Sequence, residues 1–594
     1  MRQSMSTSVP NKVGITDIVR GVARMVPDLP SMATHVPGMV VRPPTAKRTI
    51  GQIFAKRAAA HPDRPFIRWQ GESMTYGEVN RQVNRYAAVL SERGVRTGDV
   101  VGILAKNSPT DLMVILAALK LGAVAGMLNY NQHGEVIDHS MKLLDSAALI
   151  YDPECADAFA SISPERLPEH VLDFAALDAA AADKPDTDPA VTRDLPASTT
   201  AFYIFTSGTT GLPKASVMSH NRWLANYDGI GGLAVRLRPS DTMYVSLPLY
   251  HNNALSVSLG AVLAAGACIA ISKQFSASRF WDDVVTNRAT AFCYIGELCR
   301  YLLAQPSKPT DRRHSVRVIV GNGLRPEIWD EFTERFGIDR VVEFYGASEL
   351  NLAFVNAFDV KRTAGFCPLP FRVVEYNDDG TAKRDADGRL RKVPKGEPGL
   401  LIAEISDRVP VDGYTDSGDT EKKIIRDAFK KGDAYFNSGD LVRELGFAHI
   451  AFVDRLGDTF RWKGENVATT EVEGAADGVD AVAQSVAYGV EVPGCDGRAG
   501  MVAVQLRDGA ELDPKAFADE LYEALPGYAV PLFVRFVPEI ETTSTFKNRK
   551  VELRKEAYTD TGDDEVWVLC GKADGYVPYY DGYAADVAAA KVPR

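Results

Sequence analysis

The sequence is poor in cysteine and has no long apolar run. Its seven cysteines are scattered along 594 residues without a CxxC pair or a nearby histidine cluster, so neither a disulfide framework nor a zinc site is predicted. No run of 18 apolar residues occurs, and the first residues lack the order of charged, apolar and small residues that marks a signal peptide. We therefore expect no transmembrane span, reduced cysteines and a cytoplasmic location.

Positive charge is also in short supply. The chain carries 67 Lys and Arg against 78 Asp and Glu, which gives a formal net charge of -11. Nucleic acid attracts clustered basic side chains, so this balance argues against nucleic acid as a partner. With 45% apolar and 24% charged residues, the composition is that of a globular protein with a sizeable core.

The N-terminal 48 residues form an extension that contains one amphipathic helical pattern. Its apolar residues recur at helical spacing, with Arg20 and Arg24 on another face. We favour a helix that packs these residues on its own protein; the alternative is an interfacial helix that gives peripheral membrane contact. The apolar residues of the pattern are Ile15, Ile18, Val19, Val22 and Val26.

The rest of the chain predicts two domains, at residues 49–455 and 456–594. Strand-like runs such as Val100–Ala105 and Ala147–Tyr151 alternate with amphipathic helices such as Asp111–Leu121, which indicates βαβ units. The stretch Ala175–Ala197, rich in Ala, Asp and Pro, is typical of a surface linker. A change of pattern at Asp454–Lys463 predicts the start of the smaller domain.

The strongest local motif is Thr206-Ser-Gly-Thr-Thr-Gly-Leu-Pro-Lys214. It follows the apolar strand Ala201–Phe205, and we expect it to precede a helix capped by Ser219. Backbone N–H groups of a glycine-containing loop can surround a phosphate, and the hydroxyls and Lys214 add donors. The spacing of Gly208 and Gly211 is not that of the common P-loop. We predict a phosphate-binding loop; the alternative is a flexible surface loop.

Further motifs make the chain resemble the adenylate-forming superfamily, and within it the fatty acid transport protein/very-long-chain acyl-CoA synthetase family. The resemblance runs from about Thr49 to the tyrosine-rich C-terminus. The motifs that carry it, besides the phosphate loop, are Leu247-Pro-Leu-Tyr-His-Asn252, Gly321-Asn-Gly-Leu-Arg-Pro326, Glu343-Phe-Tyr-Gly-Ala-Ser-Glu349, Asn437-Ser-Gly-Asp-Leu441 and Thr545-Phe-Lys-Asn-Arg-Lys550.

The resemblance implies a fold and an activity. The implied fold is α/β, with a large N-terminal domain of helix-covered β-sheets and a smaller, mobile α+β C-terminal domain. The implied activity is that of an ATP-dependent long-chain or very-long-chain fatty acid–CoA ligase, which forms an acyl-adenylate, releases pyrophosphate and AMP, and uses ATP, Mg²⁺ and CoA. The alternatives are a fatty-acyl-AMP ligase that loads a carrier protein, and a component of fatty acid uptake.

The resemblance also assigns the nucleotide site. Tyr345 would stack on adenine, while Asp440 and Arg455 would hold the ribose. Glu349 and Thr206 would bind Mg²⁺; a buried, hydrogen-bonded glutamate is the alternative for Glu349. The complete predicted set for ATP is Thr206, Ser207, Gly208, Thr209, Thr210, Gly211, Lys214, Gly321, Asn322, Gly323, Tyr345, Gly346, Ala347, Ser348, Asp440 and Arg455.

Catalysis is assigned to Lys547 with Glu349. Lys547 resembles the lysine that neutralises charge between the carboxylate and the α-phosphate, and Lys550 is its rival. Gly464 would let CoA pass after a rotation about Leu456–Asp458. His251 is expected where the acyl chain meets the phosphate site, with a core histidine as the alternative. Leu255 stands where some relatives have a tryptophan gate, so no acyl gate is predicted.

Overall fold

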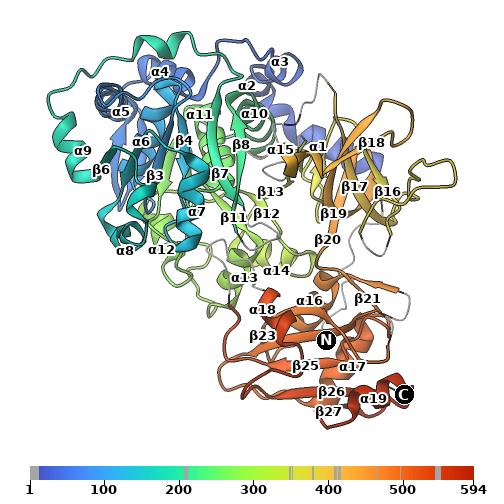
Figure 1. Ribbon diagram of the computed structural model, residues 1–594. Coiled ribbons are helices and arrows are strands. Elements are labelled where there is room, and N and C mark those ends of the chain that lie inside the picture. Colours follow the sequence, from blue (N-terminus) through green and yellow to red (C-terminus); the bar gives the residue numbers. More distant parts are fainter. Residues whose placement is uncertain are drawn as a thin grey trace.

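The computed structural model describes residues 12–206, 212–346, 350, 352–377, 380–406, 411, 417–462, 465–495, 497–541 and 550–593. Two bodies of unequal size are visible: a large one, blue to gold, and a smaller one, orange to red, formed by the C-terminal residues (Figure 1). This arrangement confirms the predicted fold class of helix-covered sheets followed by a smaller α+β domain.

The first sheet of the large domain has six strands in the order β6-β5-β3-β4-β7-β8. All neighbours are parallel except β7 and β8. The strands are β3 Val100–Leu104, β4 Val124–Met127, β5 Ala148–Tyr151, β6 His170–Asp173, β7 Thr200–Thr206 and β8 Lys214–Ser219. The helices around them are α5 Tyr76–Glu92, α6 Pro109–Leu121, α7 Glu135–Leu144, α8 Ala156–Ala160 and α9 Phe174–Ala181.

The second sheet has 14 strands, and its two halves differ in direction. The strands β10, β9, β11, β12 and β13 run parallel to one another, and the sheet continues from β13 through antiparallel pairs to β16. The first half comprises β1 Pro65–Trp69, β2 Glu72–Thr75, β9 Thr242–Val245, β10 Cys268–Ile271, β11 Ala291–Ile295, β12 Val318–Asn322 and β13 Arg340–Tyr345. The second half comprises β14 Phe354–Val355, β15 Gly365–Phe366, β16 Phe371–Val374, β17 Pro398–Glu404, β18 Ile424–Arg426, β19 Ala434–Gly446 and β20 His449–Arg455.

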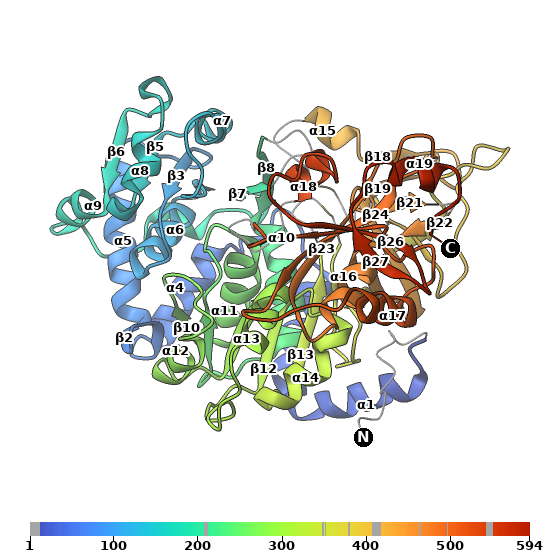
Figure 2. The ribbon, with the colours of Figure 1, turned by 90° about the horizontal axis from the view of Figure 1, so that it is seen from below.

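The remaining helices of the large domain lie beside and between the two sheets (Figures 1 and 2). They are α4 Ile50–Ala60, α10 His220–Ala225, α11 Leu259–Ala265, α12 Phe280–Thr286, α13 Gly296–Ala304, α14 Pro326–Phe336 and α15 Ser417–Glu421, with the π-helices η5 Asn226–Val235 and η6 Asn253–Ser258.

The small domain has its own core. Phe460, Val472, Met501, Phe533 and Val568 belong to one buried apolar cluster that spans Phe460 to Val587. Its strands are β21 Phe460–Trp462, β22 Glu465–Val467, β23 Val482–Val490, β24 Ala499–Leu506, β25 Phe533–Phe536, β26 Val566–Gly571 and β27 Gly575–Pro578. Its helices are α16 Thr469–Asp477, α17 Pro514–Ala524, α18 Lys550–Glu556 and α19 Tyr583–Ala588.

Local sequence explains most of these elements. Helix α6 begins where the Ser108 hydroxyl accepts a hydrogen bond from Asp111 N at 3.1 Å, and it ends at Gly122, whose φ of 73° suits glycine. The predictions for this helix and for β3 and β5 are confirmed. The linker predicted at Ala175–Ala197 is wrong at its start, because α9 continues to Ala181 and buries Leu177 against α5. Alanine favours helix, and this outweighed the turn-like composition.

The N-terminal extension folds onto the large domain through short helices, α1 Ile15–Met25, α2 Leu29–Ala33 and α3 Val36–Val40. Next to α3, the carboxylate of Asp228 on η5 is fully buried. It accepts hydrogen bonds from both terminal nitrogens of Arg48 at 2.8 and 2.9 Å, and the ring nitrogen Nδ1 of His35 lies 3.0 Å away. We call these three residues the Asp228 cluster. It ties residues 35–48 to the large domain.

The predicted packing of α1 is wrong for most of the pattern. Ile18, Gly21 and Met25 face the protein, and a Cβ on Gly21 would lie 2.5 Å from the Phe358 carbonyl oxygen. Because Gly21 approaches Phe358 so closely, the side of the helix that bears Gly21 is the packed one. The remaining apolar residues lie on the other side and face outward. Their exposed fractions are 67% for Ile15, 62% for Val19, 49% for Val22 and 56% for Val26. In Figure 2 this helix lies at the rim of the molecule.

Within the described ranges, no helix combines the length and the apolar character needed to cross a bilayer.

Candidate active site

The phosphate loop connects two antiparallel strands. Thr206 pairs with Lys214 at the loop end of the β7–β8 hairpin. The predicted order of strand, loop and helix is therefore wrong, because Lys214–Ser219 alternates its side chains between two faces as a strand and a helix begins only at His220. The predicted cap is confirmed, since the Ser219 hydroxyl accepts a hydrogen bond from Arg222 N at 3.2 Å. Ser207, Gly208, Thr209, Thr210 and Gly211 lie outside the described residues, as does the Thr206 side chain.

A glycine turn follows β12 at the carboxyl end of the parallel strands. Gly321 is closely packed, since a Cβ there would lie 2.2 Å from the Tyr294 carbonyl oxygen, and Gly323 has a φ of 84°. The buried carboxylate of Glu343, on the neighbouring strand β13, accepts hydrogen bonds from the backbone N–H groups of Gly323 and Leu324. The turn is thus fixed at the edge of the sheet where open α/β folds bind ligands.

Burial raises the pKa of Glu343 to about 8, against the opposing effect of the Tyr294 hydroxyl and the two backbone N–H groups that donate to it. Glu343 belongs to a motif that the sequence singled out, but its part in holding the turn was not predicted. No pattern along the sequence joins a strand residue to a turn 20 positions earlier.

Tyr345, Asp440 and Arg455 are brought together from three strands. The Tyr345 hydroxyl donates a hydrogen bond of 2.5 Å to Asp440 Oδ2, and the Arg455 Nε lies 3.9 Å from the other carboxylate oxygen. Asp440 and Arg455 are paired across β19 and β20. Burial, with the Asp440 charge as a further cause, raises the pKa of Tyr345 well above its ordinary value, so the phenol stays a hydrogen-bond donor. Gly346 follows this cluster at an exposed position.

This cluster fits a nucleoside. A carboxylate oxygen beside an arginine can accept hydrogen bonds from a vicinal diol, and an aromatic ring that ends a strand offers a face to a base. Tyr345 ends β13, and the Gly321–Gly323 turn ends the neighbouring parallel strand β12 of the same sheet, while Asp440 and Arg455 reach Tyr345 from β19 and β20. These two parts of the predicted set are therefore close in the fold.

His251 lies beside the same edge. The segment after it forms η6, and Asn253 of η6 donates a hydrogen bond to the Asn322 side-chain oxygen at 3.0 Å. The His251 ring packs on Tyr250, with ring centroids 4.5 Å apart. The loop of His251 thus reaches the turn of Asn322. Leu255 is fully buried.

The remaining predicted residues lie outside the described ranges: Ala347, Ser348, Glu349, Gly464 and Lys547. Both predicted Mg²⁺ ligands, Glu349 and the Thr206 side chain, are therefore outside the part of the chain that the structure describes. Among the described residues, no group of three His, Cys, Asp or Glu side chains is arranged to hold a metal ion. The described elements next to Gly464 and Lys547 are the β21–β22 hairpin and α18, which lie on different sides of the small domain (Figures 1 and 2).

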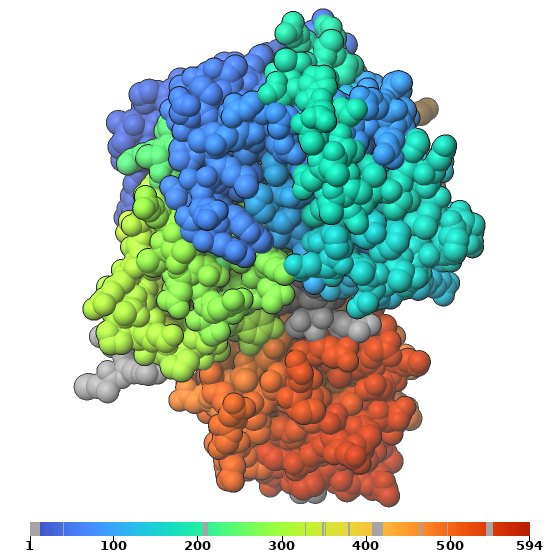
Figure 3. Space-filling view, turned by 90° about the vertical axis from the view of Figure 1, so that its left-hand side faces the viewer, coloured from blue at the N-terminus to red at the C-terminus, as the bar shows by residue number. Residues whose placement is uncertain are grey.

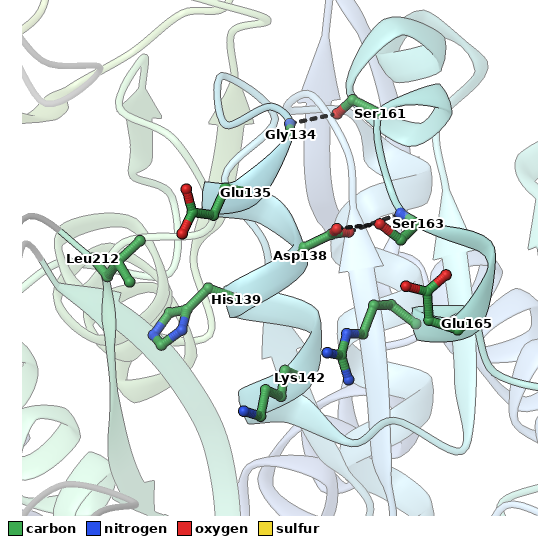
Figure 4. A pocket seen from close by; sticks show the side chains of 10 residues that line it. Gly134, Glu135, Asp138, His139, Lys142, Ser161, Ser163, Glu165 and Leu212 are labelled. Carbon is green, nitrogen blue, oxygen red and sulfur yellow. Dashed lines mark hydrogen bonds between the residues drawn. The ribbon is translucent and has the colours of Figure 1, made fainter.

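A polar hollow on the large domain lies beside α7 and not at this site. Figure 4 shows Asp138 turned toward Ser163, and Glu135, His139 and Lys142 along α7. His139 Nε2 lies 3.0 Å from the Pro213 carbonyl oxygen, next to the end of the phosphate loop. The hollow contains none of the predicted site residues, and its mixed charges favour no one class of ligand.

Comparisons with known proteins agree with this geometry. The pattern of the family described as AMP-binding enzyme matches residues 54–403, and that of the AMP-binding enzyme C-terminal domain matches residues 471–547. A medium/long-chain-fatty-acid–CoA ligase of Mycobacterium tuberculosis is 52% identical over 98% of both chains. Long-chain fatty acid transport protein 2 of Rattus norvegicus is 38% identical over 93% of this chain and 92% of its own.

A solved structure shares the fold. The crystal structure of ATP-bound MatB from Rhodopseudomonas palustris matches 86% of this chain and 99% of its own, with a TM-score of 0.74 at 23% identity. Together with the two family patterns, which match both domains, these likenesses place the chain: it belongs to the family of AMP-binding, adenylate-forming enzymes.

Proposed function

We propose that the protein is a medium- or long-chain fatty acid–CoA ligase that works through an acyl-adenylate. The observation that carries the proposal is the 52% identity with a ligase of that description over 98% of both chains. The assembly of Tyr345, Asp440 and Arg455 supports it, because it supplies a nucleoside site at the edge of the sheet.

The reaction has two half-reactions. An oxygen of the fatty carboxylate bonds to the α-phosphorus of ATP and the bond to pyrophosphate breaks, which leaves an acyl-adenylate. The CoA sulfur, after losing its proton, then bonds to the acyl carbon as the bond to AMP breaks. AMP is a far better leaving group than oxide, so the first step makes the second feasible.

Different residues would bind the nucleoside, bind the phosphates and neutralise the developing charge. Asp440, Arg455 and Tyr345 hold the nucleoside, the Thr206–Lys214 loop holds phosphates, and Lys547 neutralises the charge that develops at the α-phosphate. Mg²⁺, held by Glu349 and Thr206, would supply charge neutralisation on the phosphates. Support for Lys547 over Lys550 comes from Lys550 itself, whose ammonium is engaged by Glu473 at 2.8 Å and by the Thr469 hydroxyl at 2.8 Å.

We further propose that the domains meet at residues 455/456 and rotate about Leu456–Asp458 between the half-reactions. The small domain's core begins at Phe460, directly after this segment, and Gly457 has no atoms near its missing Cβ. Rotation would exchange the side that bears α18 for the side that bears the β21–β22 hairpin. Domain closure of this kind is common in enzymes with two chemical steps.

The test measures pyrophosphate release from ATP for acids of increasing chain length, with and without CoA. We expect adenylation to require the acid, and thioester to appear only with CoA. Lys547→Ala should lower adenylation by about 10²–10³-fold, whereas the exposed Lys555→Ala on the same segment should not. Failure of every acid to release pyrophosphate, or an undiminished Lys547→Ala enzyme, would contradict the proposal.

The same assay separates the two alternatives. A fatty-acyl-AMP ligase would accumulate acyl-AMP that CoA never consumes. A component of fatty acid uptake would still promote uptake in cells when Lys547→Ala has removed ligase activity. Neither alternative has an observation of its own in the described residues that favours it.

We also propose peripheral contact with an anionic membrane through the outer face of α1. Ile15, Val19, Val22 and Val26 form an exposed apolar stripe, and Arg20 beside it is 68% exposed. The apolar surface continues along the extension, where Leu29, Val36 and Val41 are also exposed. Aliphatic side chains can enter the headgroup region while arginine pairs with anionic lipid, so the face fits a bilayer surface despite the net negative charge.

Co-sedimentation with phosphatidylcholine vesicles, with and without phosphatidylglycerol, tests this contact. Binding should require phosphatidylglycerol and weaken at least about tenfold when Ile15, Val19 and Val22 are all changed to serine. The matched control is Val285→Ser, another exposed aliphatic residue, on α12. Equal binding by the triple variant and the control would rule out this face.

A further inference from the structure

A group of charged side chains joins the two domains where α14 of the large domain meets α16 of the small one. Arg325, the residue before α14, directs its guanidinium to Asp477 at 2.8 Å and Glu473 at 3.2 Å, both on α16. Glu297 of α13 lies 3.5 Å from the same guanidinium. Figure 3 shows the green part of the large domain resting on the orange part of the small domain in this region. We call Arg325, Glu473 and Asp477 the interdomain clamp.

The clamp continues to α18 through Glu473. One carboxylate oxygen of Glu473 faces Arg325, and the other accepts hydrogen bonds from Lys550 at 2.8 Å and from the backbone N–H of Ala487 at 3.1 Å. Lys550 is the first residue of α18 and stands three positions after Lys547 in the sequence. Through one buried carboxylate, Arg325 is therefore connected to the start of the helix that follows the predicted catalytic lysine.

The clamp is also connected to the Gly321–Gly323 turn of the large domain. Leu324, whose backbone N–H is held by Glu343, is the neighbour of Arg325 in the chain. A change in the position of the turn therefore moves the guanidinium, because one peptide unit separates them. The continuous connection runs from Glu343 through Arg325 and Glu473 to Lys550.

The clamp depends on its arginine. Burial raises the pKa of Asp477 even though Arg325 lowers it, and the neighbouring Glu473 carboxylate is almost inaccessible. Without this guanidinium, Asp477 loses its ion pair to the large domain, while Glu473 keeps its contact with Lys550 and Arg300 stays paired with Glu297 at 2.7 Å. Loss of Arg325 would therefore favour separation of α16 from α14.

We infer that Arg325 is a positioning residue that holds the small domain in the orientation for acyl-adenylate formation and releases it for thioester formation. This inference rests on the proposed function. In the structure, α16 is clamped to the large domain through Arg325, and Glu473 of α16 also holds Lys550 at the start of α18. Rotation about Leu456–Asp458 moves α16 relative to α14, so the clamp opens before the second half-reaction.

The test measures the two half-reactions separately in the full-length enzyme. Acid-dependent exchange of pyrophosphate into ATP reports the first, and the reaction of CoA with pre-formed acyl-adenylate reports the second. Arg325→Ala should slow the first by about tenfold, equivalent to about 1.4 kcal/mol, and leave the second equal or faster. Asp477→Asn, which keeps the shape of α16, should shift the two rates in the same directions by a smaller factor.

Arg335→Ala is the matched control. Arg335 lies on α14, the helix that Arg325 precedes, and pairs with Asp311 at 2.8 Å, within the large domain. It should change both half-reactions by the same factor, or neither. Equal loss of both half-reactions in Arg325→Ala, or no loss, would overturn the inference. An unmodified enzyme that releases no pyrophosphate with any acid would instead overturn the proposed function.

Discussion

The Asp228 cluster and the interdomain clamp are both built on arginine and carboxylate, yet water reaches them to different degrees. The Asp228 carboxylate is fully buried under residues 35–48, whereas the Asp477 carboxylate at the clamp is 16% exposed; the two arginines, Arg48 and Arg325, are 33% and 20% exposed. In the first, one carboxylate has three nitrogens near it; in the second, one guanidinium is shared among three carboxylates. A sealed ion pair is costly to break, while a partly hydrated one can exchange its partners for water. Permanent attachment suits the first position and reversible attachment the second.

The largest effect is expected at the sealed cluster. Asp228→Ala would leave Arg48 and His35 without their anion in a closed site, and should lower the free energy of unfolding by about 3–5 kcal/mol. Urea denaturation measures this change. The control is Asp194→Ala, which removes an exposed partner of Lys47 in the same extension and should leave the midpoint unchanged. Equal midpoints for the two variants would contradict the comparison.

The two carboxylates should also respond to pH in opposite ways. Although burial opposes ionisation, hydrogen bonds from His35 and Arg48 lower the pKa of Asp228, so its stabilisation is complete above its ordinary pKa of 3.8 and is lost as pH falls through the lowered value. Burial raises the pKa of Asp477, so the protonated form is favoured in the folded state and stability declines as pH rises from 3.8 through the raised value.

Unfolding free energies of the unmodified protein, Asp228→Asn and Asp477→Asn between pH 3 and 7 test these signs, about the range in which carboxyl groups titrate. The difference between the unmodified protein and Asp228→Asn should shrink toward low pH. The difference for Asp477→Asn should change in the opposite direction. Parallel curves would show that the two sites do not differ.

Salt should distinguish the clusters more weakly. A double-mutant cycle between Arg325 and Asp477 should give a coupling of about 1 kcal/mol that falls in high salt, because mobile ions screen partly exposed charges. The cycle between Arg48 and Asp228 should be larger and depend less on salt, because the Asp228 carboxylate is fully buried. A coupling at the clamp that depends as little on salt would mean that it is as sealed as the Asp228 cluster.

The smallest effect is expected at an interdomain ion pair that water surrounds. Arg443 of β19 lies 3.6 Å from Glu471 of α16, with both side chains substantially exposed. Arg443→Ala should cost about 0.2–0.5 kcal/mol and leave the ratio of the two half-reaction rates unchanged. A shift in that ratio as large as in Arg325→Ala would show that any charge between the domains suffices, whatever its burial.

Much of the nucleotide site could be predicted from the sequence. Tyr345 and Asp440 lie 95 positions apart, and only their resemblance to known motifs joined them before the structure brought their side chains into contact. Glu343 and Arg325 were missed as functional side chains, because their partners Gly323 and Glu473 are set by the packing of strands and domains. Such contacts leave no period or spacing along the chain.

Two predictions about single elements were wrong, one for the segment before His220 and one for the packed side of α1. The sequence predicts a loop that leads to a helix capped by Ser219, and this cap is present, but the six residues before His220 form a strand. In α1, the helical spacing of apolar residues identified the helix correctly. It could not tell which side the Gly21 contact with Phe358 would bury, since glycine carries no hydrophobic signal.

The β7–β8 hairpin has a consequence for how ATP is attracted. A loop that opens directly onto a helix gains the positive end of that helix as a fixed partial charge, but here the strand β8 intervenes and α10 begins six residues later. The phosphate loop at this position must draw its field from its own N–H groups and from formal charges such as Lys214. Neutral substitution of that one lysine should therefore alter the ionic-strength dependence of nucleotide binding, and not only its strength.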